Sequence, residues 1–169
     1  MDWSADPPDG CTPLETPPSF GEGRSFVSGD PQGNRIRVRY FLRNSDSAIV
    51  ARAWFGPGAE GPPGHAHGGS MAAALDECMG AAAWLSGHAV VAGRLVVDFR
   101  AMLPLEAAVT IVARVAEVSG RRVTTRARIE GADGTLYAEG EGLFVVIQPE
   151  RFGEIAQYAL DAAARIRGG

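Results

Sequence analysis

The segment 68–87 constrains the fold most, because its twenty residues include only two charged side chains, Asp76 and Glu77. Its six alanines favour a helix, and its large apolar side chains are spread around the helical circumference. Such a helix is expected to be buried, with Gly87 as its C-terminal cap. A carboxylate in the middle of a buried helix needs a specific partner or a chemical role.

Strand-like segments surround this helix in the sequence. Near 34–40, arginines alternate with apolar residues, which is typical of a half-buried strand. Glycine and proline clusters separate the other segments. Two strands are predicted before the helix and four after it, at 34–40, 47–55, 93–103, 107–119, 122–130 and 135–147. This order predicts an α+β fold in which an antiparallel sheet wraps around one long central helix, with a partner subunit covering the helix's far side.

The 169 residues suit one domain preceded by an arm. Residues 1–34 are rich in proline and glycine and are predicted to form an irregular N-terminal arm. Residues 35–169 are predicted to form a single domain that ends in an amphipathic helix at about 150–167.

The composition excludes several functions. The net charge of −4 argues against binding of nucleic acid, which requires a basic surface. All sixteen basic residues are arginine, so a Schiff-base lysine and a Ser–Lys dyad are excluded within this chain. Cys11 and Cys78 do not form a disulfide framework, and Cys78 is expected to be a small buried apolar side chain. No signal peptide and no membrane span are predicted, so we expect a cytoplasmic protein with reduced thiols.

The start of the predicted helix and its central acid are the candidate site. Gly68 and Gly69 allow a ligand close to the backbone, where unpaired N–H groups favour an oxygen that gains negative charge. A tight turn is the alternative role of these glycines. Asp76 is the preferred catalytic acid, although it could instead bond a partner chain or a buried water. Glu77 projects about 100° away around the helix and is expected to be structural or interfacial.

His65 and His67 have the H-x-H spacing that can supply two ligands to a metal ion. A cupin-like metal site also needs a glutamate four or five residues later, where this chain has Met71 and Ala72. His88, the third histidine, has no neighbouring ligand. We therefore predict no metal.

The combination H-G-G followed by Asp, in 67–76, resembles the PaaI-type hotdog-fold thioesterases of the 4-hydroxybenzoyl-CoA thioesterase superfamily. The resemblance covers about 47–148 and implies a hotdog fold with active sites at a dimer interface. It implies that the Gly68 N–H polarises a thioester carbonyl and that Asp76, from the other subunit, is the nucleophile or the general base. His67 would orient the acyl group or form a hydrogen bond with it. The implied substrate is an acyl-CoA or acyl-carrier-protein thioester, and the implied assembly is a homodimer or homotetramer. The resemblance implies no cofactor other than the coenzyme A that is part of the substrate.

The chain departs from this family at two places. Relatives often have Thr or Ser near Ala92, where it positions water, and a basic Pro-containing motif where this chain has Arg100 to Pro104. The first departure keeps open a hotdog protein that binds acyl-CoA or acyl carrier protein without hydrolysis. A structural dimer or a dehydratase-like relative ranks lower.

Arginines are the candidate contacts for CoA phosphates. Arg100, Arg121 and Arg122 are predicted to bind substrate, together with Gly69 and His65. A different role is expected on the predicted strand 122–130, where arginines alternate with apolar residues. Folding at 131–134 would place these arginines beside two glutamates and form a salt ladder. The ladder residues are Arg126, Arg128, Glu139 and Glu141.

Overall fold

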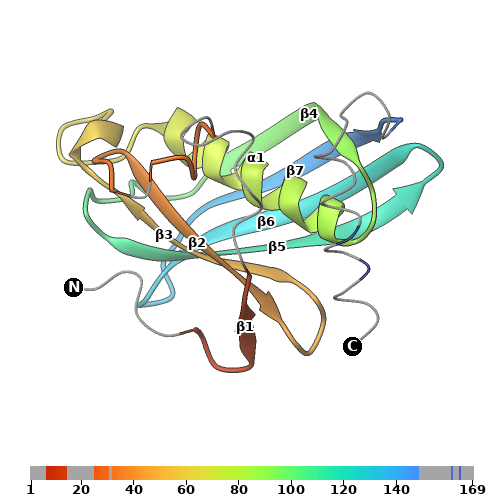
Figure 1. The fold of residues 1–169 in the computed structure, drawn as a ribbon. Coiled ribbons are helices and arrows are strands. Elements are labelled where there is room, and N and C mark those ends of the chain that lie inside the picture. The colour runs from red at the N-terminus through yellow and green to blue at the C-terminus, as the bar shows by residue number, and fades with distance from the viewer. Residues whose placement is uncertain (1–6, 15–24, 31, 149–160, 162–163, 165–169) are drawn as a thin grey trace.

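The computed structural model describes residues 7–14, 25–30, 32–148, 161 and 164, and it shows a curved antiparallel sheet wrapped around one long helix (Figure 1). The helix, α1, spans Gly68–Leu85. The strands are β1 (Cys11–Pro13), β2 (Ile36–Arg43), β3 (Ile49–Phe55), β4 (Val90–Phe99), β5 (Ala108–Ser119), β6 (Arg122–Gly131) and β7 (Leu136–Val146), and a short 3-10 helix, η1, spans Pro57–Ala59.

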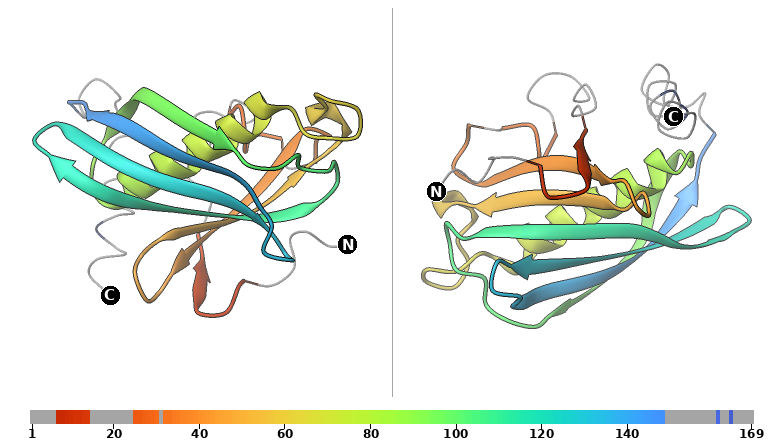
Figure 2. Two further views of the ribbon diagram at one scale, coloured as in Figure 1. Left: turned by 180° about the vertical axis from the view of Figure 1, so that it is seen from behind. Right: turned by 90° about the horizontal axis from the view of Figure 1, so that it is seen from below.

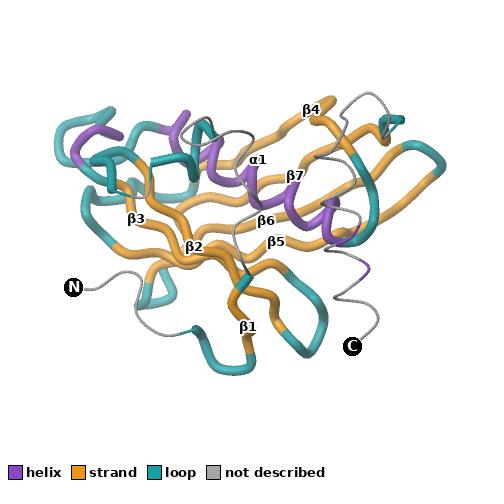
Figure 3. Tube along the Cα trace, in the orientation of Figure 1, coloured by secondary structure: helices purple, strands orange, loops and turns teal. Residues whose placement is uncertain are grey.

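The sheet order is β1-β2-β3-β5-β6-β7-β4, and every pairing is antiparallel. The strand that follows the helix, β4, therefore forms one edge of the sheet and, among the described residues, pairs only with β7. Figures 2 and 3 show α1 lying across the concave face of this sheet. The predicted fold class is confirmed.

The core lies between α1 and the concave face because both elements present small and apolar side chains there. The buried side chains of α1 are Met71, Ala74, Leu75, Cys78, Met79, Ala82 and Ala83. A Cβ atom at Gly140 of β7 would lie 3.5 Å from both Leu75 and Met79, so a glycine here lets the helix approach the sheet closely. At the other end of α1, Ser86 is the C-cap and Gly87 has a φ of 93°, as the sequence predicts.

Several sequence predictions differ from the structure, and one lies mostly outside the described residues. The arm is not wholly irregular, because β1 pairs with β2. The strand predicted at 93–103 begins earlier, at Val90, and ends at Phe99, because Leu103 turns into the core and Pro104 bridges to His65. The predicted C-terminal helix lies outside the described residues, apart from two positions, 161 and 164, that are helical.

Candidate functional site

The loop before α1 is fixed by backbone hydrogen bonds on both sides. The N–H of His67 donates to Ala59 of η1 at 2.8 Å, and that of Ala66 donates to Leu103 at 2.8 Å. Gly64 has a φ of 75°, a conformation that suits glycine, and its N–H donates to the Glu60 carboxylate at 2.8 Å. These bonds position the first turn of the helix.

His67 is the N-cap of α1. Its ring atom Nδ1 accepts the Gly69 N–H at 2.9 Å, which satisfies one of the unpaired donors of the first turn. Its own carbonyl accepts the Ser70 N–H at 2.9 Å. The structure therefore gives His67 a capping role, and the Gly69 N–H is already bonded.

Gly68 is the first residue of the helix, where the N–H has no partner within the helix. A Cβ atom at this position would lie 3.2 Å from the Phe99 ring, so a side chain here would crowd the end of β4. Phe99 is exposed, which leaves the ring and the helix start together on the surface. Sequence reasoning missed Phe99, because its approach to Gly68 depends on where β4 ends.

Asp76 lies two turns further along α1 and is half-buried. Its Oδ1 is buried and accepts no hydrogen bond from the described residues. Burial raises the pKa of this carboxyl group, and the neighbouring Glu77 charge raises it further. An unpaired carboxylate in this setting is a strong proton acceptor.

Glu77 projects about 100° away from Asp76 around the helix, and both of its carboxylate oxygens accept hydrogen bonds. Its carboxylate accepts hydrogen bonds from the hydroxyl groups of Tyr40 on β2 and of Ser25, the latter at 3.0 Å. Burial is the main reason why the pKa of Tyr40 lies well above its ordinary value. The prediction that Glu77 is structural or interfacial is compatible with these bonds. Its two partners lie too far from it in the chain for a sequence pattern to indicate them.

The two main elements of the predicted site do not meet within one chain. Gly68 and Asp76 are eight residues apart on one helix, which corresponds to about 12 Å along its axis. One thioester carbonyl cannot contact an N–H group and a carboxylate separated by that distance. The predicted roles of Asp76 and Gly68 on one carbonyl are therefore compatible only with groups that come from different copies.

The predicted CoA-binding arginines lie at opposite ends of the sheet. Arg100 follows β4 near the helix start and forms ion pairs with Glu139 at 2.6 Å and Asp98 at 3.7 Å. Arg121 lies in the β5–β6 turn and donates to the Val146 carbonyl at 3.1 Å, and Arg122 follows it as the first residue of β6. The structure does not bring all three arginines together in one chain.

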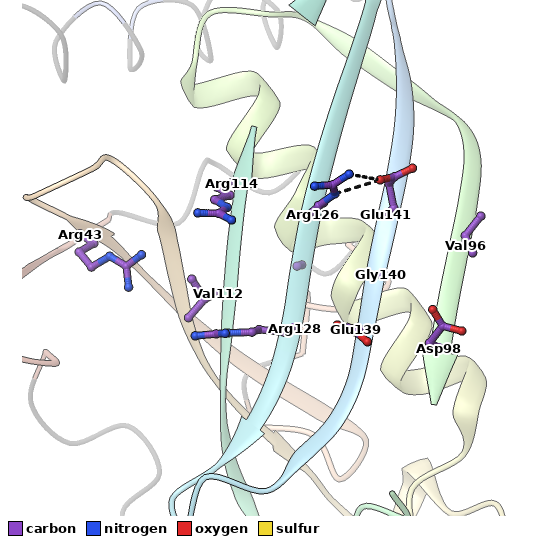
Figure 4. Close-up of a pocket in the computed structure, with 11 residues that line it drawn as sticks. Arg43, Val96, Asp98, Val112, Arg114, Arg126, Arg128, Glu139, Gly140 and Glu141 are labelled. Atoms are coloured by element: carbon purple, nitrogen blue, oxygen red, sulfur yellow. Dashed lines mark hydrogen bonds and ion pairs between the residues drawn. The ribbon is translucent and has the colours of Figure 1, made fainter. Parts of the chain in front are cut away.

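The predicted salt ladder forms only in part. Arg126 pairs with Glu141 at 2.9 Å, as predicted, on the convex face that lines a charged pocket (Figure 4). The pairing predicted for Arg128 is wrong. It lies opposite Glu139 in the register but bonds Glu130 of its own strand at 3.1 Å. Glu139 is instead bonded to Arg100.

The remaining predicted residues are placed as follows. Nδ1 of His65 forms a hydrogen bond with the Pro63 carbonyl oxygen at 2.8 Å, and this bond stabilises the loop before α1. In the described part of the chain, no three histidine, cysteine, aspartate or glutamate side chains gather as metal ligands would.

Cys78 is buried, and burial raises the pKa of its thiol strongly, which agrees with its predicted role as an apolar side chain. No helix among the described residues has the length and apolar character that crossing a bilayer requires.

Comparison with known proteins gives consistent matches. The sequence profile of the thioesterase superfamily matches residues 63–138, which include the helix start and Asp76. The chain is 30% identical over 149 residues to the acyl-coenzyme A thioesterase THEM4 of Xenopus laevis, covering 78% of this chain and 67% of that protein. It is 29% identical over 139 residues to the acyl-coenzyme A thioesterase THEM5 of Mus musculus, covering 81% of this chain and 56% of that protein. The chain thus spans between about half and two thirds of the length of these relatives.

Solved structures show the same fold. The thioesterase superfamily protein RHA08564 is similar with a TM-score of 0.65 and 30% identity, over 70% of this chain and 58% of that one. The PaaI protein of E. coli is similar with a TM-score of 0.62 and 16% identity, over 72% of this chain and 86% of that one. The second likeness concerns the fold alone.

Proposed function

The chain belongs to the thioesterase superfamily, and we propose that it hydrolyses acyl-coenzyme A thioesters at sites assembled between two copies. The observation that carries this proposal is Asp76, a half-buried carboxylate whose Oδ1 has no hydrogen-bond partner among the described residues. The names of the curated relatives support acyl-CoA as the substrate class.

The outer edge of β4, which no described strand pairs with, supports a dimer. This strand is ten residues long, ends the sheet, and exposes Val91, Val96 and Phe99. An unpaired edge of this length favours pairing with a second strand. Pairing of two β4 edges would bring two copies of α1 side by side, which suits the need for Asp76 and Gly68 from different copies. Two such dimers could also associate into a homotetramer, which we propose as the alternative assembly.

In the proposed reaction, the Gly68 N–H of one copy donates to the thioester carbonyl oxygen. As general base, Asp76 of the other copy takes a proton from water, and the water oxygen bonds the carbonyl carbon. The C–S bond then breaks, and the thiolate of CoA takes the proton from Asp76, which yields a carboxylic acid and free CoA. As nucleophile, Asp76 would instead form a mixed anhydride that water hydrolyses.

Residues around the helix start have supporting roles in this proposal. His67 caps the helix through Nδ1 and so orients the Gly68 N–H, while Gly69 and His65 shape the loop that contacts the acyl thioester. Arg121 and Arg122 are the proposed contacts for CoA phosphates, whereas Arg100 is held in ion pairs. A carrier-protein thioester is the alternative donor of the same acyl group.

One observation favours a second function. Ala92 lies on β4, opposite Phe144, and offers only a methyl group where relatives often place a hydroxyl. The second candidate is therefore a protein that binds acyl-CoA without hydrolysing it. Thiol release from a panel of acyl-CoA substrates separates the two functions. Binding without thiol release would support the second function and overturn the first.

A further inference from the structure

A buried phenylalanine fills the space beside two glycines between α1 and the sheet. Phe144 of β7 is 3% exposed. A Cβ atom at Gly142 would overlap its ring, and one at Gly80 of α1 would lie 3.7 Å from it. Glycine inside a helix or a strand lowers stability, so two glycines against one ring indicate a place where space is needed.

This ring lies beside the proposed catalytic acid. Gly80 follows Asp76 by four residues, so the two positions lie one above the other on the same face of α1. The ring therefore packs against α1 about one helical turn beyond Asp76, toward the C-terminal end of the helix. Toward the N-terminal end of α1, the helix begins at Gly68, which lies beside the exposed Phe99. An acyl chain that avoids water would follow the buried direction and meet Phe144.

A second observation marks the same place. Thr125 of β6 is fully buried, and its hydroxyl group has no hydrogen-bond partner among the described residues. Its Oγ1 lies 3.2 Å from the position that a Cβ atom of Gly142 would take. Buried hydroxyl groups are normally bonded, so this one is available as a partner for a ligand or a water molecule.

We propose that Phe144 closes the inner end of the acyl-binding site and restricts the enzyme to short acyl groups, with Thr125 at the far wall. The restriction rests on the proposed hydrolysis of acyl-CoA at Asp76. One helical turn, about 6 Å along the axis, separates Asp76 from the residue that the ring contacts, and this short separation is the reason to expect a preference for short acyl groups. Longer chains require the ring to leave its place against Gly80 and Gly142.

The test compares Phe144→Ala and the milder Phe144→Leu with the wild-type protein on saturated acyl-CoA substrates from acetyl to palmitoyl. Wild-type kcat/KM should fall beyond about five carbons, and Phe144→Ala should raise the decanoyl-to-butanoyl ratio at least about tenfold, since each buried methylene changes binding about fourfold. Ile129→Ala is the matched control. Ile129 is fully buried on the same face of β6, about 20 Å from the residue opposite Phe144, and its variant should keep the wild-type profile.

Binding of non-hydrolysable S-alkyl-CoA thioethers of the same lengths keeps the two proposals separate. If the wild type binds short thioethers but releases no thiol from any acyl-CoA, the hydrolase function fails while the length restriction stands. If the chain-length profiles of binding and turnover are the same for the wild type and both Phe144 variants, the length restriction is overturned. A folded Phe144→Leu variant gives the answer where Phe144→Ala does not fold.

Discussion

Asp76 and Glu77 are adjacent on α1, yet their carboxylates have opposite hydrogen-bonding states. Glu77 accepts bonds from Tyr40 and Ser25, whereas the buried Oδ1 of Asp76 accepts none from the described residues. The Glu77 charge also contributes to the raised pKa of Asp76. Glu77 thus connects the helix to β2, whereas Asp76 keeps a carboxylate oxygen that can accept a proton in the proposed reaction.

Replacement of this available acid should abolish turnover. Asp76→Asn keeps the shape of the side chain but removes the proton acceptor, so kcat should fall at least about 10²-fold while short-chain acyl-CoA still binds. Thiol release and calorimetric binding measure the two effects. Glu117→Gln, which removes one charge from an exposed position of β5, is the control and should retain activity. Wild-type turnover in Asp76→Asn would refute the assigned role.

The N–H group of Gly68 can be removed without breaking the helix. Gly68→Pro replaces the first helical residue, where proline is well tolerated, and should lower kcat about 10²–10³-fold. Gly68→Ala is its control, because it adds the same Cβ atom 3.2 Å from the Phe99 ring but keeps the N–H group. Mixed dimers then test whether the site is shared. An Asp76→Asn copy combined with a Gly68→Pro copy contains one intact site only if the two groups come from different chains.

Equal mixing of these two inactive variants, after unfolding and refolding together, should restore about one quarter of wild-type activity, because half of the dimers are mixed and each has one intact site. The control is the double variant, which should remain inactive in any mixture. Absence of restoration, with mixed dimers verified by mass spectrometry, would contradict a site shared between copies.

The pKa of Asp76 predicts how stability depends on pH. A raised pKa means that the native state binds the proton more tightly than the unfolded chain, so ionised Asp76 lowers stability as pH rises above its ordinary value of 3.8. Asp76→Asn should therefore have a higher Tm than the wild type at pH 7. The difference should shrink as the pH falls to that value, and thermal melts across this range measure it.

Asp46 provides a comparison of opposite sign. Arg43 holds its pKa at about 2, so this carboxylate stabilises the native state above its ordinary pKa, and the effect is lost as pH falls toward 2. Asp46→Asn should lower Tm at pH 7 and not at pH 2. Equal shifts for both Asn variants at pH 7 would contradict the pKa directions.

His67 should act mainly through the cap. His67→Ala removes the acceptor of the Gly69 N–H and should lower the free energy of unfolding by about 1 kcal/mol. His67→Asn restores a capping oxygen and should recover most of this loss, as denaturant unfolding would show. If His67→Asn recovers stability but not kcat, the ring contacts the acyl group directly, as the family resemblance implies.

Local patterns predicted most of the fold, and long-range contacts account for the errors. The alternation of arginine with apolar residues located β2, and the alanine-rich segment located α1, because both periodicities depend on neighbouring residues. The end of β4 was misplaced, since the turn after Phe99 is set by burial of Leu103 against distant residues. A sequence pattern does not contain such contacts.

The same distinction applies to the site. The spacing of Gly68 and Asp76 was visible in the sequence, whereas the expectation that two chains share the site came from the family resemblance. The bond from Ser25 to Glu77 and the ring of Phe144 beside Gly80 were not visible, because each depends on the packing of segments that are far apart in the chain.

The position of β4 at the sheet edge has a consequence for synthesis. Its first residue, Val90, pairs with Val146 near the end of β7, so β4 leaves the ribosome long before its partner strand is made. During that interval, the nascent chain exposes an unpaired strand and the apolar helix that precedes it, a combination that attracts chaperones and other nascent chains. We expect premature termination before β7 to yield aggregates rather than a smaller folded protein.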